Sequence, residues 1–218
     1  MHLAFAKRRR RACARLAAVK RMGNAERKSL AQALLLAKRG HRGLFRNAFP
    51  CSIILHNIRS VYNVGSIFRT ADAAGVSKII LSGYTPTPID RFANPRKDFA
   101  KVSLGAEKMV AWEQTKTLGA AIKKLKKENY FVVAVEQDKR ATSLFDFKPP
   151  KNKKLALVLG NEVRGLSKSA LNLCDAIVEI PMRGHLVRHA HHPRQTRRGK
   201  ESLNVSVAAG VAVFLLTQ

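Results

Sequence analysis

Three short segments of the chain carry polar residues and glycines that local structure alone does not require. The first is NVGSIFRTADAAG, residues 63–75, in which Asn63, Gly65 and Arg69 interrupt an otherwise apolar helical stretch. Because a glycine near the start of a helix weakens it, local helix stability does not explain this set. Either Gly65 and Arg69 are incidental surface residues, or a ligand must come close to this face of the helix.

The periodicity of this segment predicts a helix near residues 64–74. One face, which we expect to pack on a sheet, is apolar and comprises Val64, Ile67, Phe68 and Ala71. Gly65, Arg69 and Asp72 are expected on the opposite face, with Asn63 as the N-cap. An ordinary amphipathic helix with an exposed Arg69–Asp72 pair would also explain the pattern.

The second segment is LALVLGNEVRGLS, residues 155–167, where a strand-like apolar run leads directly into Gly160, Glu162 and Gly165. In parallel sheets, ligands bind beyond the carboxyl ends of the strands, and glycines there allow the backbone to approach a cofactor. An ordinary strand–turn–helix connection, with Glu162 near a helix N-terminus, is the alternative.

The third segment is IPMRG, residues 180–184, together with ESLNVSVAAGVAVF, residues 201–214. Ser202 is predicted to cap the last helix, with Asn204 in its first turn, and capping alone would explain the serine. This helix is apolar on nearly all sides, so we expect it to be buried in the core or against a second subunit.

The elements that would position these segments alternate between strand and helix. Short apolar runs predict strands at residues 51–56, 77–82, 130–136, 153–160 and 176–181, and helices are expected near 64–74, 115–128 and 202–216. A polar, proline-containing connection follows at residues 83–99. The sequence therefore predicts an α/β fold with a largely parallel sheet covered by helices on both faces.

The charge of the chain indicates a polyanionic partner. The 218 residues include 41 lysines and arginines but only 14 acidic residues, which gives a formal net charge of +27. Nucleic acid is therefore the favoured partner class. A membrane is the competing partner, but no apolar run approaches the roughly 20 residues that a spanning helix needs.

The three cysteines, Cys13, Cys51 and Cys174, are too few and too scattered for a disulfide framework or a CxxC metal site. These cysteines indicate a reducing, intracellular setting, and the N-terminus lacks the apolar region of a secretory signal, so we expect a cytoplasmic protein. Its Arg-rich, acid-poor start is also compatible with an organelle transit peptide, although Ser29 is the only serine before Ser52.

Taken together and in this order, the three segments resemble the three motifs of the SpoU–TrmH branch of the SPOUT RNA methyltransferases. The stretch KVSLGAEKMVAWEQ, residues 101–114, is also similar to the connecting region of that family. The resemblance covers roughly residues 51–218. It implies S-adenosylmethionine-dependent methylation of a ribose 2′-OH in tRNA or rRNA, a homodimer, and a deep trefoil knot in the C-terminal part of the fold.

The resemblance also implies roles for individual residues. It further implies a reaction that needs no metal. The residues that match the cofactor-binding positions of the family are Leu159, Gly160, Glu162, Gly165, Ile180, Met182, Leu203 and Asn204. Those that match its polar catalytic set are Asn63, Arg69, Glu162, Ser202 and Asn204. Since a guanidinium keeps its proton above pH 12, we expect Arg69 to stabilise a developing alkoxide and to position phosphate rather than to act as a base.

The chain departs from the family pattern in one place. Residues 183–200 are rich in arginine and histidine and contain about 15 extra residues, approximately 185–199, inside the expected cofactor-binding knot. An outward bulge would preserve the fold, because long loops close at modest entropic cost. A displaced loop would abolish cofactor binding and leave a non-catalytic RNA-binding protein on the same fold. A metal site at the histidines is disfavoured, since neither a cysteine nor an acid joins them.

Two domains are expected. Residues 47–218 would form the methyltransferase domain, and residues 1–46 a basic extension that is partly helical or disordered. The extension holds 14 lysines and arginines and a single acid, Glu26. It would contact RNA phosphates, with an affinity that falls steeply with salt. A solvated surface segment is the alternative.

Overall fold

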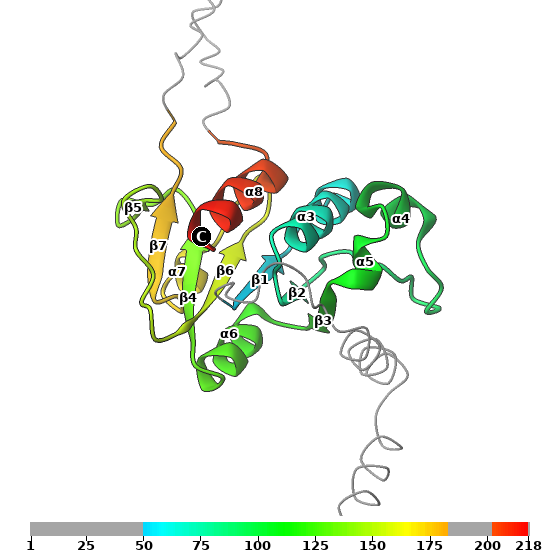
Figure 1. The fold of residues 1–218 in the computed structure, drawn as a ribbon, viewed down its shortest axis with the longest axis horizontal. Helices are drawn as coiled ribbons and strands as arrows, with labels where there is room; N and C mark the ends of the chain where they lie inside the picture. Colours follow the sequence, from blue (N-terminus) through cyan, green and yellow to red (C-terminus); the bar gives the residue numbers. More distant parts are fainter. Residues whose placement is uncertain (1–49, 183–201, 218) are drawn as a thin grey trace, which may run out of the picture. The chain divides into compact units, whose positions relative to one another are not determined.

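The computed structural model of the protein describes residues 50–182 and 202–217. These residues form a sheet in the order β3-β2-β1-β6-β4-β7-β5, in which every neighbouring pair of strands is parallel. Figure 1 shows the sheet running through the middle of the described part of the chain, with helices packed along it. The strands are β1 Cys51–His56, β2 Lys78–Ser82, β3 Ala111–Thr115, β4 Tyr130–Val135, β5 Thr142–Ser143, β6 Lys154–Leu159 and β7 Ala176–Glu179.

Helices cover both faces of this sheet. The helices are α3 Val61–Ala73, α4 Lys97–Ser103, α5 Ala106–Met109, α6 Leu118–Lys127, α7 Lys168–Leu171 and α8 Val205–Leu216. One core cluster joins the sheet to α3, α4, α5 and α8, and a second joins the opposite face to α6 and α7. Along β1, Ile53 and Leu55 point into the first cluster while Ile54 points into the second. The predicted α/β fold with a two-sided parallel sheet is confirmed.

Helix α3 begins three residues before the predicted start. Its N-cap is Ser60, whose hydroxyl accepts a hydrogen bond from the Asn63 main-chain N–H at 3.2 Å, so the prediction that Asn63 caps the helix is wrong. Gly65 is buried rather than exposed, and a Cβ built there would lie 3.0 Å from the Cβ of Val102. The glycine therefore serves the close packing of α3 against α4, which is fixed further by the edge-to-face contact of Phe68 with Phe99.

Helix α8 begins at Val205, with Asn204 as its N-cap. The Asn204 side chain accepts from the Ser206 N–H at 2.8 Å, so the prediction of Ser202 as the cap is wrong. Val205, Ala209, Ala212, Val213 and Leu216 are buried, whereas Val207, Phe214 and Leu215 are exposed by 50%, 46% and 38%. In Figure 1, α8 lies beside α3 on the same side of the sheet.

Five short elements were not predicted from the sequence, namely α4, α5, α7, β3 and β5. Strand β3 is only partly buried along its length and pairs with β2 alone, so it lacks the apolar run of a central strand. The basic extension 1–46, expected to be partly helical or disordered, lies outside the described residues. Among the described helices, none has both the length and the apolar character to cross a membrane.

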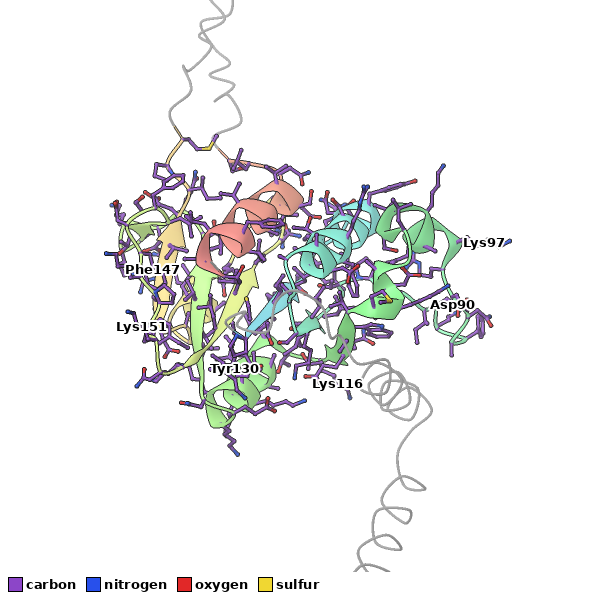
Figure 2. The ribbon with its side chains drawn as sticks, in the orientation of Figure 1. Asp90, Lys97, Lys116, Tyr130, Phe147 and Lys151 are labelled. Atoms are coloured by element: carbon purple, nitrogen blue, oxygen red, sulfur yellow. The ribbon has the colours of Figure 1, made fainter. Side chains whose placement is uncertain are left out.

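The connection from β2 to α4, residues 83–96, is anchored at its start by Thr85. The buried hydroxyl of Thr85 lies 3.0 Å from the Leu55 carbonyl oxygen and 2.9 Å from that of Ser82, and it accepts from the Ile58 N–H at 3.1 Å. In Figure 2, Asp90 marks the connection at one end of the sheet, close to Lys97 at the start of α4, and Phe147 and Lys151 lie at the other end. Thr85 thus joins the carboxyl ends of β1 and β2.

We predict that Thr85→Val destabilises the fold by about 1–3 kcal/mol, because it leaves the Ile58 N–H buried without an acceptor. The free energy of unfolding is measured by urea denaturation. Thr85→Ser, which keeps the hydroxyl, is the matched control and should retain most of the stability. A loss of stability in Thr85→Ser that exceeds the loss in Thr85→Val would show that the methyl group of Thr85, rather than its hydroxyl, matters.

Candidate functional site

A cavity of about 260 Å³ opens at the carboxyl ends of three neighbouring strands. Val135, Leu159 and Glu179, the last residues of β4, β6 and β7, form its floor. The loop that follows β6 and the residues that precede α8 form its walls. This is the edge of a parallel sheet at which ligands bind.

Most of the residues predicted to bind the cofactor line this cavity. They are Leu159, Gly160, Glu162, Gly165, Ile180, Met182 and Leu203, and Ser202 lines it as well. Asn204 is not part of the lining. The cavity therefore brings together residues that are more than 40 positions apart in the sequence.

The loop after β6 is held in one conformation by Asn161. The Oδ1 atom of this buried residue accepts the N–H groups of Val163 and Arg164, both at 2.9 Å, and its carbonyl oxygen accepts the Gly165 N–H at 2.9 Å. Gly165 has a φ of +62°, which favours glycine. A Cβ on Gly160 would lie 2.7 Å from the Gly165 carbonyl carbon, so the tight loop requires glycine at both positions.

Glu136 holds the far side of this loop and was not predicted from the sequence. Its carboxylate accepts the Leu166 N–H at 2.7 Å and the Gln137 N–H at 3.1 Å. Any side chain at Gly165 would overlap this carboxylate. Glu136 directly follows β4, so its position at the carboxyl end of a buried parallel strand could have identified it.

Glu162 connects this loop to the N-terminus of α3. Its Oε1 and Oε2 atoms accept the Arg59 N–H at 3.2 and 3.0 Å, and Oε1 also accepts the Ser60 N–H at 3.1 Å. The Asn63 Nδ2 atom donates to Oε1 at 3.1 Å, and the Asn204 Nδ2 atom donates to the Oδ1 atom of Asn63 at 3.2 Å. The structure thus joins Glu162, Asn63 and Asn204, one from each motif, in a single hydrogen-bonded chain.

The environment of Glu162 favours its charged form. Partial burial raises its pKa and is the largest single effect, but the N–H groups of Arg59 and Ser60, the residue's own N–H and the Asn63 amide together lower the pKa below the ordinary value of 4.5. A carboxylate at a helix N-terminus is also favoured by the helix dipole. Glu162 is therefore an ionised acceptor that organises its neighbours.

The other two predicted catalytic residues lie outside this hydrogen-bonded chain. Arg69 is exposed on α3 beyond Asn63, and it makes no hydrogen bond or ion pair with the described part of the protein, so the alternative Arg69–Asp72 pair is not formed there. Ser202 is exposed at the mouth of the cavity. The roles of both residues stay predictions.

Within residues 50–182 and 202–217, no three histidine, cysteine, aspartate or glutamate side chains gather in an arrangement that could hold a metal ion. The histidines of the atypical segment 183–200, and the extra residues 185–199, lie outside the described residues. The prediction about the effect of this segment on the cavity therefore stays open.

We predict that Glu162→Gln destabilises the protein by about 1 kcal/mol near neutral pH, because the α3 N-terminus loses its charged acceptor. Since the folded-state pKa is lowered, this advantage of the wild type is complete above about pH 4.5 and disappears as the pH falls through the folded-state pKa. Urea denaturation at about pH 7 and about pH 3 tests this. Glu128→Gln, at an exposed carboxylate, is the control, and a pH-independent difference for Glu162→Gln would contradict the prediction.

The sequence model of the SpoU rRNA methylase family matches residues 50–187. The 23S rRNA (guanosine-2′-O-)-methyltransferase of Ralstonia nicotianae is 32% identical over 167 residues, which are 76% of this chain and 57% of that protein. The enzyme of the same name from Blochmanniella floridana is 33% identical over 172 residues, 77% of this chain and 57% of the relative.

Solved structures agree with this match. The AdoMet-bound rRNA methyltransferase of Sinorhizobium meliloti superposes with a TM-score of 0.63 at 26% identity, covering 78% of this chain and 56% of that one. The TrmH/SpoU tRNA modifying enzyme of A. aeolicus has a TM-score of 0.60 at 22% identity, covering 88% and 81%, and so shows the shared fold. The chain spans a little over half the length of the curated relatives it matches. From the family match, the sequence identity and the shared fold, the chain belongs to the SpoU rRNA methylase family.

Proposed function

We propose that the protein transfers a methyl group from S-adenosylmethionine to a ribose 2′-OH of rRNA or tRNA. The observation that carries this proposal is the cavity beyond β4, β6 and β7, because seven of the eight predicted cofactor residues line it. The hydrogen-bonded set of Glu162, Asn63 and Asn204 lies at the same loop, so three of the five predicted catalytic residues lie at the same edge of the sheet as the predicted cofactor residues. The names of the relatives support the same activity.

The cavity suits the chemistry of this cofactor. Within the described residues, the charged lining residues are Glu136, Glu162, Glu179 and Arg164, so carboxylates outnumber cations among them although the whole chain carries a net charge of +27. Acidic surroundings favour a ligand with a sulfonium and an ammonium group. Gly160 and Gly165 allow main-chain groups to approach it. When bound, the cofactor supplies an activated methyl group, for which the reaction needs no metal.

The residues of this chain would then align and stabilise the nucleophile. A ribose hydroxyl is a weak acid, so its developing negative charge must be stabilised as it attacks the methyl carbon. Arg69 is exposed and without a partner among the described residues, which leaves its guanidinium available for the ribose oxygen or an adjacent phosphate. Asn63 and Glu162 would orient Arg69 or the ribose, and Ser202 and Asn204 would order the cofactor loop. The proton would leave to phosphate or water.

The proposed C-terminal trefoil knot is supported by the placement of Met182 and Leu203. These residues stand on either side of the undescribed segment 183–201, and both line the cavity with Gly160 and Gly165 of the loop after β6. A chain that leaves and returns to one cavity beside this loop is compatible with threading through it. A threaded chain would be an exception to the rule that chains avoid knots.

A homodimer is supported by the uncovered face of α8. Val207, Phe214 and Leu215 form an exposed apolar edge on a helix whose other side is buried in the core. Exposed apolar side chains on one helix are typical of an interface between subunits. The two-domain division at residues 46 and 47, the RNA-docking role of residues 1–46 and a cytoplasmic location stay predictions.

A non-catalytic RNA-binding protein is the second candidate. It is favoured by the extra residues 185–199, since both flanks of this segment reach the cavity, and a shift of either Met182 or Leu203 would distort the lining. The hydrogen-bonded set of Glu162, Asn63 and Asn204 favours the enzyme.

The first test is S-adenosylmethionine binding by calorimetry, with the intact chain beside a variant that lacks residues 185–199. The proposed function predicts binding by the intact chain near the micromolar range, worth roughly 8 kcal/mol. No binding by the intact chain, with binding restored by the deletion, would favour the non-catalytic alternative.

The second test is methyl transfer to total RNA, followed by analysis of 2′-O-methylated nucleosides. Arg69→Ala should keep S-adenosylmethionine affinity and lower the rate of methylation by about 100- to 1,000-fold, because the alkoxide loses its stabilising charge. Arg69→Lys, which keeps a charge, should lose less. An unchanged rate for Arg69→Ala would remove this residue from the catalytic set.

A further inference from the structure

Two of the most exposed aromatic side chains of the described chain lie in one connection, residues 83–96 between β2 and α4. Phe92 is 70% exposed and Tyr84 is 60% exposed. Single exposed apolar residues are common and need no explanation. Tyr84 and Phe92 differ from such single exposed residues, because both belong to one hydrogen-bonded connection that holds their rings away from the core.

The part of the connection that carries Phe92 is a closed loop. The Asp90 carboxylate accepts the N–H groups of Phe92 and Asn94, both at 2.8 Å, and the Asp90 N–H donates to the Asn94 carbonyl at 2.9 Å. Ile89 and Pro95 form an antiparallel bridge at its base. Phe92 is therefore presented on a preorganised support, so a ligand that contacts the ring pays little ordering entropy.

Tyr84 is fixed beside the candidate catalytic loop. Its hydroxyl accepts a hydrogen bond from the Asn161 Nδ2 atom at 3.0 Å, and its N–H donates to the Oδ1 atom of Asn57 at 3.3 Å. Asn161 directly precedes Glu162 and organises the loop that lines the cavity. The exposed ring of Tyr84 thus lies next to the loop at which the ribose is expected.

A cationic side chain lies over the exposed ring of Phe92. The Arg91 guanidinium carbon lies 4.7 Å from the centroid of the Phe92 ring, and Lys97 is exposed at the start of α4. The nearby carboxylates are engaged within the protein, since Asp90 accepts the loop N–H groups and Asp98 pairs with Arg96 at 2.6 Å. Figure 2 shows Asp90 and Lys97 on this projecting part of the molecule.

We propose that residues 83–96 form a docking surface for unpaired nucleotides of RNA, with the rings of Tyr84 and Phe92 as stacking platforms. Bases stack on single aromatic rings, and arginines beside the rings bind phosphate or extend the stack. A protein partner is less well matched, because the side chain over the Phe92 ring is the charged Arg91 and the exposed residue Asn94 of the same loop is polar. This surface rests on the proposed function only in taking RNA as the substrate.

The two rings would divide the substrate between them. Tyr84 would hold a nucleotide close to the target ribose, and Phe92 would hold one further along the strand. Bases in a duplex are already stacked and paired, so the surface selects single-stranded or looped RNA. The target nucleotide would accordingly lie in an unpaired region.

The test is binding of the full chain to a fluorescein-labelled oligouridylate of about 12 nucleotides, followed by fluorescence anisotropy. Phe92→Ala and Tyr84→Leu should each weaken binding by about 5- to 100-fold, with an unchanged salt dependence because neither ring is charged. Tyr84→Phe keeps the ring and should bind like the wild type. Phe145→Ala is the matched control, since Phe145 is an aromatic residue exposed by 57% elsewhere on the described chain.

A duplex of the same length separates stacking from phosphate contacts. The ring variants should bind the duplex like the wild type, whereas Arg91→Gln should weaken both ligands and lower the salt slope by about one. Affinities of Phe92→Ala and Tyr84→Leu equal to that of Phe145→Ala would overturn the proposal. A change in the oligomeric state of Phe92→Ala, measured by sedimentation, would also overturn the proposal, because the ring would then lie in a contact between copies of the chain. Neither result depends on S-adenosylmethionine binding or methyl transfer, so the proposed function is judged separately.

Discussion

The site depends on one carboxylate, Glu162, at the N-terminus of α3. A helix N-terminus leaves main-chain N–H groups without partners in the helix, and here a residue about 100 positions away supplies the acceptor for the N–H groups of Arg59 and Ser60. The same carboxylate accepts the Asn63 amide, which in turn accepts from Asn204. A single charged group therefore fixes the loop after β6, the start of α3 and the entry to α8 relative to one another.

The glycines act through close approach rather than flexibility. Gly65 lets α3 pack against α4, while Gly160 and Gly165 let the loop after β6 fold back on itself beside Glu136. These contacts bring the main chain of the loop to the edge of the cavity. The rigid loop and the tight helix packing are thus two parts of one arrangement, since both hold the polar residues of the site at the carboxyl ends of the strands.

Charge is distributed unevenly in a way that suits two different ligands. The chain as a whole is strongly basic, yet among the residues that the structure describes, three of the four charged ones that line the cavity are acidic. The aromatic rings of Tyr84 and Phe92 lie on the adjoining connection, with Arg91 and Lys97 facing solvent. A cationic methyl donor and a polyanionic acceptor can therefore approach the same sheet edge without competing for one electrostatic environment.

The sequence by itself determined the alternation of buried strands and helices, the strands β1, β2, β4, β6 and β7, and the three motifs, because apolar runs and glycine spacing are local properties. The caps of α3 and α8 were identified only in the structure, where Ser60 and Asn204, rather than Asn63 and Ser202, lie where the chain enters each helix. Gly65 was assigned to the wrong face because a helical wheel contains no information about α4. The place of Glu136 in the site and the hydrogen bonds of Glu162 to α3 depend on which strand ends become neighbours. The neighbours of each strand in a parallel sheet are set only when residues far apart in the sequence come together.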